Sequence, residues 1–554
     1  MAGGAIAAVH GTADISRTEA PVTIKTYLMC AFAAFGGIFF GYDTGWMGGV
    51  LGMPYFIAQY TDNKLYPGIT ANNIPSTFAI SASNKSLMTS ILSAGTFFGA
   101  LVASDIADAI GRRPTIIIGS IVFCVGCVLE IASSGQLALF CIGRIIAGLG
   151  VGFISNIIIL YISEIAPKKV RGALVAGYQF CITIGILIAG LVVYATQDRL
   201  DTGSYRIPIG VQFLWALILG TGLIFLPESP RYYVRKGDLE KAGIALAKVR
   251  SQPIESDYVQ DELAEIVANN EYEMALVPAT TYLGGWAACF KGSLSDSSSN
   301  LRRSILGIGL QAMQQLTGIN FIFYFGTSFF QTLGTIKNPF LTEVITNIVN
   351  VVATPPAFWI VERFGRRKIL IIGAACMVIS QYIVAIVGVA APNAQVVGAN
   401  KPAVSAELAF ICLNVAVFAC TWGPSAWVVV GEIFPLPIRA RGVGLSAASN
   451  WFWNCIIAVI TPYLVSTDEA NLGPKVFFVW GSTAMLSLTF AYFLVPETKG
   501  LSLEQVDKML AETTPRHSAK WVPHETWAAT EGLVEKPVDD VQQIEVPSGD
   551  EKVV

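Results

Sequence analysis

Four amide side chains stand close together in an otherwise apolar stretch of this 554-residue chain. Residues 304–332 are mostly apolar and long enough to cross a bilayer, yet they include Gln311, Gln314, Gln315 and Asn320. The three glutamines have the i, i+3, i+4 spacing that places side chains on one face of a helix. Amides in hydrocarbon are costly without partners, so this face is expected to line a polar cavity or to contact another helix.

Two kinds of role fit these amides. Glutamine and asparagine can hold two membrane helices together by hydrogen bonds across their interface. The neighbouring Phe321, Phe323 and Tyr324 favour a binding site instead. Amides donate and accept hydrogen bonds, and aromatic rings stack on the C–H faces of sugars, so the predicted ligand is neutral and rich in hydroxyl groups.

Two ionisable residues lie well inside other apolar runs: Asp43 in FFGYDTGWMGG and Arg144 in CIGRIIAG. Charged groups inside a membrane are costly and usually functional, and opposite charges on neighbouring spans can satisfy each other. One interpretation is a permanent structural salt bridge. The other is that Asp43 accepts a proton, which releases Arg144 and couples proton entry to a conformational change.

Membrane-spanning helices must position these residues. The chain is 53% hydrophobic and 14% charged, whereas soluble domains carry about a quarter charged residues. We therefore predict an all-α polytopic membrane protein with twelve transmembrane helices. The predicted spans are 27–51, 86–107, 115–133, 137–161, 173–196, 207–226, 304–332, 341–361, 368–391, 404–433, 442–466 and 474–495.

The basic residues set the expected orientation of these spans. An even number of spans puts both tails on one side, and most of the 36 Lys and Arg residues fall in the segments on that side. The positive-inside rule then predicts that both termini are cytoplasmic. The predicted parts are an N-terminal tail (1–26), a six-helix half (27–226), a cytoplasmic linker with short helices (227–303), a second six-helix half (304–495) and a cytoplasmic C-terminal tail (496–554).

Three stretches outside the spans have amphipathic patterns that predict short helices. Two of them, GDLEKAGIALAKVR and YVQDELAEIVANNEYE, lie in the linker, and LSLEQVDKMLAE begins the C-terminal tail. The remainder of that tail is polar, with proline and acidic residues, and is predicted to be disordered.

Three pairs of signatures repeat between the two halves, each at the cytoplasmic end of the corresponding span. The pairs are AIGRRP at 109–114 with RFGRRK at 363–368, SEIAPKKVRG at 163–172 with GEIFPLPIRARG at 431–442, and PESPR at 227–231 with PETKG at 496–500. Two six-span repeats related by an axis along the membrane normal are the architecture of the major facilitator class.

With these signatures, and with GRIIAGLGVG at 143–152 and QQLTGIN at 314–320, the chain resembles the sugar porters of the major facilitator superfamily. The resemblance covers about residues 25–510 and is greatest to fungal high-affinity hexose (glucose) transporters. One departure is Ala109 in DIADAIGRR, where the family usually has a basic residue.

The resemblance implies that several neutral side chains converge on one central sugar site. The implied substrate-binding residues are Gln179, Gln314, Gln315, Asn320, Asn350, Trp427, Asn450 and Trp451. For Trp451, and for the nearby Asn454, helix packing is an equal alternative to sugar contact. Asp43 matches the proton-carrying aspartate of coupled sugar porters, so Asp43 and Arg144 are the predicted proton-coupling pair, although some passive yeast hexose carriers also keep this aspartate.

Charged residues at the cytoplasmic ends of the spans are predicted to form a latch of ion pairs, part of which breaks when the site opens inward. They are Asp108, Arg112, Arg113, Glu164, Arg171, Glu228, Glu362, Arg366, Glu432 and Arg439. The alternative, that they only satisfy the positive-inside rule, fits the arginines better than the glutamates.

The predicted function is monosaccharide transport across the plasma membrane by alternating access, as a monomer in the lipid bilayer, with sugar:proton symport. Glucose or another hexose is the expected substrate, with xylose as a further candidate. Alternatives are a passive hexose facilitator, a transporter-like sugar sensor and a quinate-type organic-acid permease. No enzyme activity, metal, cofactor or nucleic-acid partner is predicted, because the three histidines lie in the tails, the ten cysteines are scattered and the net charge is −3.

Overall fold

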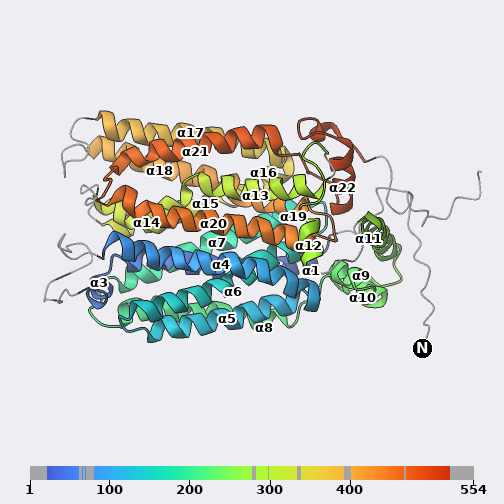
Figure 1. Cartoon of the computed structure of the whole chain (residues 1–554), viewed down its shortest axis with the longest axis horizontal. Coiled ribbons are helices and arrows are strands. Elements are labelled where there is room, and N and C mark those ends of the chain that lie inside the picture. Colours follow the sequence, from blue (N-terminus) through green and yellow to red (C-terminus); the bar gives the residue numbers. More distant parts are fainter. Residues whose placement is uncertain are drawn as a thin grey trace, which may run out of the picture.

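The computed structural model describes residues 22–61, 65, 69, 80–276, 282–296, 299–332, 338–391, 401–466 and 469–523. It is a bundle of long helices that run side by side, with the helices of the first half grouped below those of the second half in Figure 1. Most of the N-terminal tail lies outside the described residues. The disorder predicted for the C-terminal tail begins after residue 512; the described residues 513–523 include a 3-10 turn, and the tail from residue 524 onward lies outside the described residues.

Six long helical segments form the first half. They are α1 (Ile24–Ala34) continued by α2 (Gly36–Val50), α4 (Ala82–Ile110), α5 (Arg112–Ala132), α6 (Leu137–Ile165), α7 (Arg171–Thr196) and α8 (Gly203–Leu223), with the short α3 (Pro54–Gln59) after α2. Each overlaps one of the six predicted spans.

The second half repeats this pattern with more interruptions. Its helices are α13 (Asn300–Leu316) and α14 (Ile319–Thr332), α15 (Pro339–Ala353) and α16 (Pro356–Phe364), α17 (Arg366–Ala390), α18 (Lys401–Cys420) and α19 (Trp422–Glu432), α20 (Arg439–Val465), and α21 (Val476–Leu494) after the 3-10 turn η2 (Gly473–Lys475). Ten segments of the described chain can each cross a membrane, and α15 with α16, bent by 43°, makes an eleventh. α13 and α14 complete the twelve, so the predicted fold class is confirmed.

Two of the interruptions have a clear backbone cause. Gly318 separates α13 from α14 with φ +78°, and a Cβ atom there would lie 2.6 Å from the side chain of Trp480. Pro355 and Pro356 lack the N–H groups that would continue α15. The bend at the two prolines was not expected from the sequence.

α13 begins before the predicted span 304–332. α13 begins at Asn300 rather than at residue 304, because the Ser299 side chain accepts a hydrogen bond from the backbone N–H of Arg302 and so caps the helix earlier.

Short helices gather at one end of the bundle, on the right of Figure 1, which we call the linker end. They are α9 (Pro230–Arg235), α10 (Leu239–Arg250), α11 (Asp257–Leu276), α12 (Tyr282–Ala288) and α22 (Leu503–Glu512), followed by the 3-10 turn η3 (Ser518–Lys520). α10, α11 and α22 fall on the three stretches predicted to form short helices. A capping box between Ser502 and Gln505 begins α22.

The glycines of residues 143–152 let α6 pack closely between α4 and α5. A Cβ atom at Gly148 would lie 2.3 Å from the carbonyl oxygen of Leu92, and one at Gly150 would lie 2.6 Å from the backbone nitrogen of Phe123. This close packing explains the glycine-rich motif and fixes the helix that carries Arg144.

Candidate functional site

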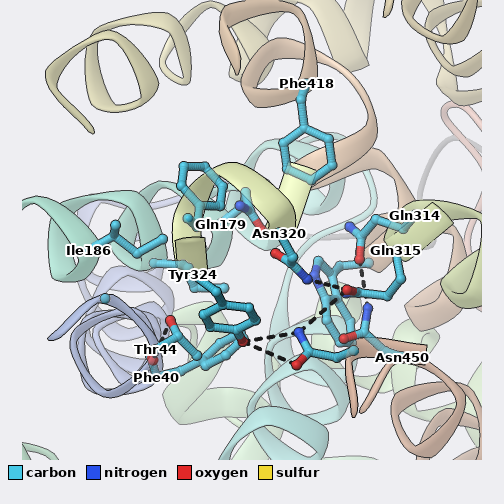
Figure 2. Close-up of a pocket in the computed structure, with 15 residues that line it drawn as sticks. Phe40, Thr44, Gln179, Ile186, Gln314, Gln315, Asn320, Tyr324, Phe418 and Asn450 are labelled. Carbon is cyan, nitrogen blue, oxygen red and sulfur yellow. Dashed lines mark hydrogen bonds between the residues drawn. The ribbon is translucent and has the colours of Figure 1, made fainter. Parts of the chain in front are cut away.

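A cavity lies between the two halves of the bundle. Residues from α2, α7, α13, α14, α18, α19 and α20 line it: Phe40, Thr44, Gly45, Gln179, Ile182, Ile186, Gln314, Gln315, Asn320, Phe323, Tyr324, Phe418, Trp427, Asn450 and Asn454. Figure 2 shows their side chains converging on a common space. All fifteen are uncharged, so the lining suits a neutral polar ligand.

The Gln314 amide is fixed by backbone groups at the break between α18 and α19. Its Nε2 donates to the carbonyl oxygens of Trp422 (3.0 Å) and Gly423 (2.9 Å). Its Oε1 accepts from Asn450 Nδ2 (2.8 Å), which also donates to Gln311 Oε1 (2.7 Å). This wall of the cavity is therefore pre-organised before any ligand binds.

A second group of hydrogen bonds joins α13, α14 and α20 (Figure 2). Gln315 Oε1 accepts from Asn320 Nδ2 and from Asn454 Nδ2 (3.4 Å). Asn454 Oδ1 accepts from the Tyr324 hydroxyl (3.2 Å) and from Ser93 Oγ of α4 (2.7 Å). The Ser93 bond crosses between the halves, so a movement of one half relative to the other changes this group.

Gln179 differs from the other amides. It is 7% exposed, and its side chain forms no hydrogen bond within the part of the chain that the structure describes. Ile182 and Ile186 follow it at i+3 and i+7 and also line the cavity, so this face of α7 is turned toward the ligand space. An amide without a protein partner at a cavity wall is available to a ligand.

Six of the eight predicted substrate-binding residues line this cavity. They are Gln179, Gln314, Gln315, Asn320, Trp427 and Asn450. Their roles in binding stay predictions, as do those of the other two. The Trp427 ring makes an edge contact with Tyr178, 6.3 Å between centroids, which holds the indole at the cavity wall.

Asn350 and Trp451 are not part of the lining. Asn350 is buried on α15, and its Oδ1 has no hydrogen-bond partner among the described residues. Trp451 packs on Phe40 with ring centroids 5.0 Å apart and donates to Ser155 Oγ (3.3 Å). Trp451 therefore supports the cavity wall from behind, which corresponds to the packing alternative.

The sequence did not single out Phe40, Thr44, Ile182, Ile186 or Phe418 as lining residues. Phe40 and Thr44 have the i, i+4 spacing of one helix face, and Thr44 directly follows Asp43. That spacing could have indicated a common face toward the cavity. Because the run is apolar all round, however, the sequence does not show which face of the helix is turned toward a ligand.

Asp43 and Arg144 meet inside the first half, as expected from their positions. Arg144 Nη1 lies 3.2 Å from Asp43 Oδ1, and both side chains are buried. Trp46 donates its indole N–H to Asp43 Oδ1 (3.4 Å), and its ring lies 5.1 Å from the guanidinium. With its amide oriented to satisfy both ends, Gln212 of α8 donates to Asp43 Oδ1 (3.0 Å) and accepts from Trp46 (3.2 Å).

Predicted latch residues of the first half form one cluster at the linker end. Arg112 binds Glu164 with two hydrogen bonds (3.0 and 2.9 Å) and lies 3.5 Å from Asp108. Glu228 accepts the backbone N–H groups of Arg112 (3.0 Å) and Arg113 (3.1 Å). These contacts join α4, α5, α6 and the PESPR segment within one half.

The second half repeats this cluster. Arg366 binds Glu432 (3.3 and 3.0 Å) and lies 3.2 Å from Glu362. Glu497 of the PETKG segment accepts the backbone N–H groups of Arg366 (2.8 Å) and Arg367 (3.3 Å). Glu497 takes the place of Glu228, but it was not among the predicted residues although its signature was identified.

The repeated glycines of the two GRR turns make these contacts possible. Gly111 and Gly365 have φ of +107° and +87°, a region that favours glycine. A Cβ atom would lie 2.4 Å from Glu228 at the first and 2.2 Å from Glu497 at the second. Burial raises the pKa of both carboxyl groups, and the backbone N–H donors act in the opposite direction.

Contacts between the halves at the linker end involve other partners. The backbone N–H of Ala173 donates to Glu362 Oε1 (3.0 Å). Arg441 of α20 binds Asp105 of α4 at 2.9 Å, and Trp286 of α12 donates to the same carboxylate (3.0 Å). The sequence had not identified Asp105, Arg441 or Trp286.

Arg171 and Arg439 begin the corresponding helices α7 and α20, and their side chains donate hydrogen bonds to backbone carbonyl oxygens. Arg171 donates to the carbonyl oxygens of Ala166 (3.4 Å) and, across the halves, Leu501 (3.4 Å). Arg439 Nε donates to the carbonyl oxygen of Phe434 (2.8 Å), and among the described residues no carboxylate lies within salt-bridge distance of it. Most predicted latch residues thus stabilise each half, and few of them connect the halves.

Comparison with known proteins identifies the family. A family model described as "Sugar (and other) transporter" matches residues 29–510. The chain belongs to the sugar porter family of the major facilitator superfamily. This sugar porter is 44% identical over 503 residues to the "Major facilitator-type transporter ecdD" of Aspergillus rugulosus, covering 90% of this chain and 89% of that protein.

Two further fungal relatives have different described roles. This sugar porter is 40% identical to the "High glucose sensor RGT2" of Saccharomyces cerevisiae, over 90% of this chain but only 62% of the sensor. It is 37% identical to the "Probable glucose transporter rco-3" of Neurospora crassa, over 93% of this chain and 84% of the relative.

A solved structure shares the fold of this sugar porter. It is the proton:xylose symporter XylE, a protein of E. coli, bound to 6-bromo-6-deoxy-D-glucose. The two chains are 26% identical with a TM-score of 0.72, and the match covers 88% of this chain and 99% of XylE.

Proposed function

We propose that this sugar porter carries a monosaccharide, glucose first, across the plasma membrane by alternating access, with both termini in the cytoplasm. The lining of the central cavity carries the proposal: it presents amides and aromatic rings and no charge. Such groups bind hydroxyls and the C–H faces of a pyranose and disfavour ions. Relatives described as glucose transporters support a hexose, and the likeness to XylE keeps xylose as a candidate.

The same lining disfavours an organic-acid substrate. A carboxylate in the cavity needs a cationic partner, and Arg144 is bound to Asp43 instead of lining the cavity. Membership of a transporter family and a cavity built for neutral binding also favour carriage over catalysis.

We further propose that transport is coupled to a proton through Asp43 and Arg144. An ionised Asp43 holds Arg144 at 3.2 Å, whereas a protonated Asp43 has no charge to hold it. Asp43 lies on α2 one residue before Thr44, which lines the cavity, so a change at Asp43 reaches the sugar site along one helix. The description of XylE as a proton:xylose symporter supports this mode.

Uptake of labelled glucose by cells without their own hexose carriers tests the proposal. Wild type is expected to accumulate glucose, and a protonophore is expected to abolish the accumulation. Asp43→Asn is expected to abolish accumulation while sugar exchange across the membrane survives. Asp201→Asn, the same change at an exposed carboxylate that pairs with Arg199, is the matched control and is expected to behave as wild type.

Equilibration of glucose that neither the protonophore nor Asp43→Asn affects would show a passive facilitator. The second candidate is a sugar sensor, which the 40% identity to RGT2 favours. No uptake by a correctly localised protein, together with a glucose-dependent signal, would support the sensor.

A further inference from the structure

A second buried carboxylate approaches Arg144. Glu130 lies on α5 and is 0% exposed. Its Oε1 is 3.9 Å from Arg144 Nη1, the same nitrogen that lies 3.2 Å from Asp43 Oδ1. One guanidinium nitrogen therefore stands between two carboxylates that come from different helices.

Several buried atoms of this group have no hydrogen-bond partner among the residues that the structure describes. They are both carboxylate oxygens of Glu130, Oδ2 of Asp43 and Nε of Arg144. A buried ionised carboxylate without donors is very costly, whereas a protonated carboxyl carries its own donor. The two carboxylate oxygens of Glu130 that lack donors therefore fit a protonated side chain better than an ionised one.

The surroundings of Glu130 supply one cation for two carboxylates. The ionisable groups of the described chain that face it are Arg144 from α6, Asp43 from α2, Cys127 from α5 and Tyr60 after α3. Arg206 at the start of α8 is directed elsewhere and donates to Ser134 Oγ (3.0 Å). With both carboxylates ionised the group carries one net negative charge, which one bound proton cancels.

Glu130 lies nearer than Asp43 to the end of its helix. It is in the last turn of α5, whereas Asp43 is about two turns before the end of α2. Both helices end opposite the linker end. α1, which α2 continues, begins beside α10, where Thr26 Oγ1 donates to the carbonyl oxygen of Val249 (2.6 Å), and α5 begins at Arg112 in the cluster at the linker end. In the proposed topology this end of the bundle is external.

We propose that Asp43, Arg144 and Glu130 form one proton-holding centre, in which Glu130 takes the proton from the external side and becomes the partner of Arg144 whenever Asp43 is protonated. The proton first adds to a carboxylate oxygen of Glu130 as an O–H group and then moves to a carboxylate oxygen of Asp43, so Glu130 becomes ionised as Asp43 becomes neutral. Arg144 moves its hydrogen bonds to the carboxylate that remains ionised. The buried guanidinium is thus never left without a counter-ion, a state that would be strongly unfavourable.

This inference rests on the proposed proton symport, and the pH dependence of uptake tests it. Glu130→Gln removes the competing carboxylate, so Arg144 stays with Asp43 and stabilises its ionised form. Half-maximal concentrative uptake is expected to move about one pH unit toward acid, a tenfold change in proton concentration. Glu407→Gln, the same change at a buried carboxyl of α18 in the other half, is expected to leave the midpoint in place.

A purely structural Glu130 would lower uptake by one factor at every pH without moving the midpoint, and that result would overturn the proposal. Glu130→Asp keeps the carboxyl group and is expected to retain most of the wild-type profile. If Glu130→Asp loses the wild-type profile and Glu130→Gln leaves the pH midpoint of uptake unchanged, that result would also count against the centre.

Infrared spectroscopy of the purified protein separates this inference from the proposed function, because it needs no transport. Wild type at neutral pH is expected to show a protonated-carboxyl band that both Glu130→Gln and Asp43→Asn remove. If the band is present but glucose is not accumulated, the centre stands and symport fails. If accumulation is proton-driven while neither the band nor the pH midpoint responds to Glu130→Gln, symport stands and the centre fails.

Discussion

At the scale of single residues, the cavity contains amides that already have protein partners and one that does not. Gln314 and Asn450 are held by hydrogen bonds, which fixes the geometry of one wall. Gln179 on the opposite half has no such bond within the described chain and is only 7% exposed. This amide is available to a ligand, and the proposed sugar would supply a hydroxyl group for it.

We expect Gln179→Ala to raise the KM for glucose about two- to tenfold, because one hydrogen bond between neutral groups contributes about 0.5–1.5 kcal/mol. Initial uptake rates over a range of glucose concentrations measure this. Gln381→Ala is the matched control: Gln381 donates to the carbonyl oxygen of Thr317 (2.7 Å) outside the cavity, so its loss is expected to lower thermal stability and leave KM unchanged. An unchanged KM in Gln179→Ala would remove this residue from the binding site.

The sequence predicted which amides of α13 and α14 line the cavity better than it predicted where the side chains of other helices point. Gln314, Gln315 and Asn320 stand out because polar groups in an apolar span are rare and costly. The rotation of a span about its axis is less visible when its residues are apolar all round, so Asn350 was expected in the cavity and Phe40 was not. Only the packing of α2 and α15 against their neighbours fixes these directions.

At the scale of helices, a clasp between α4, α12 and α20 connects the halves at the linker end. Arg441 binds Asp105 at 2.9 Å, and Trp286 adds its N–H to the same carboxylate. The guanidinium also lies 5.8 Å from the Trp286 ring. Opening the cavity toward the linker end has to separate these groups.

We expect Arg441→Ala to increase opening at the linker end by about fivefold. The charged side chains are 13% and 16% exposed, so the ion pair is close to the surface class that contributes about 1 kcal/mol or less. Faster hydrogen–deuterium exchange in α12 would report this opening. The charge swap Asp105→Arg with Arg441→Asp is expected to restore slow exchange, and equal exchange in wild type and Arg441→Ala would exclude the clasp.

The twelve spans could be predicted because apolar length is a local property, and the clasp could not. Asp105 and Arg441 are far apart in sequence, and their pairing depends on how α4 and α20 cross. Pro355 and Pro356 were a local signal for the bend between α15 and α16. Because proline is tolerated inside membrane helices, these two residues alone did not predict a bend.

At the scale of the whole molecule, α22 ties the C-terminal tail to the linker and both halves. Arg231 of α9 binds Glu504 (2.7 and 3.2 Å) and also donates to the carbonyl oxygen of Glu164 (2.7 Å). Arg303 of α13 pairs with Asp507. These side chains are buried, so the tail helix is part of the folded structure and not an appendage.

The Arg231–Glu504 pair is sensitive only to strong acid. Burial alone would raise the pKa of Glu504, but the charges of Arg231 and Arg439 outweigh it and lower the pKa to about 2. A pKa lowered in the folded state contributes stability above the unfolded value of about 4.3, and that stability is lost as the pH falls toward 2. Near neutral pH the Arg231–Glu504 pair is therefore fully charged.

We expect Arg231→Ala to destabilise the protein by about 3–5 kcal/mol, because it leaves the carboxylate of Glu504 buried without its partner. The double substitution Arg231→Met with Glu504→Leu is expected to recover most of this loss, since apolar side chains of similar volume need no counter-charge. Thermal melting of the purified protein near neutral pH measures both changes. A single variant as stable as wild type, or a double variant less stable than the single one, would show that packing of α22 and not this charge pair holds the tail.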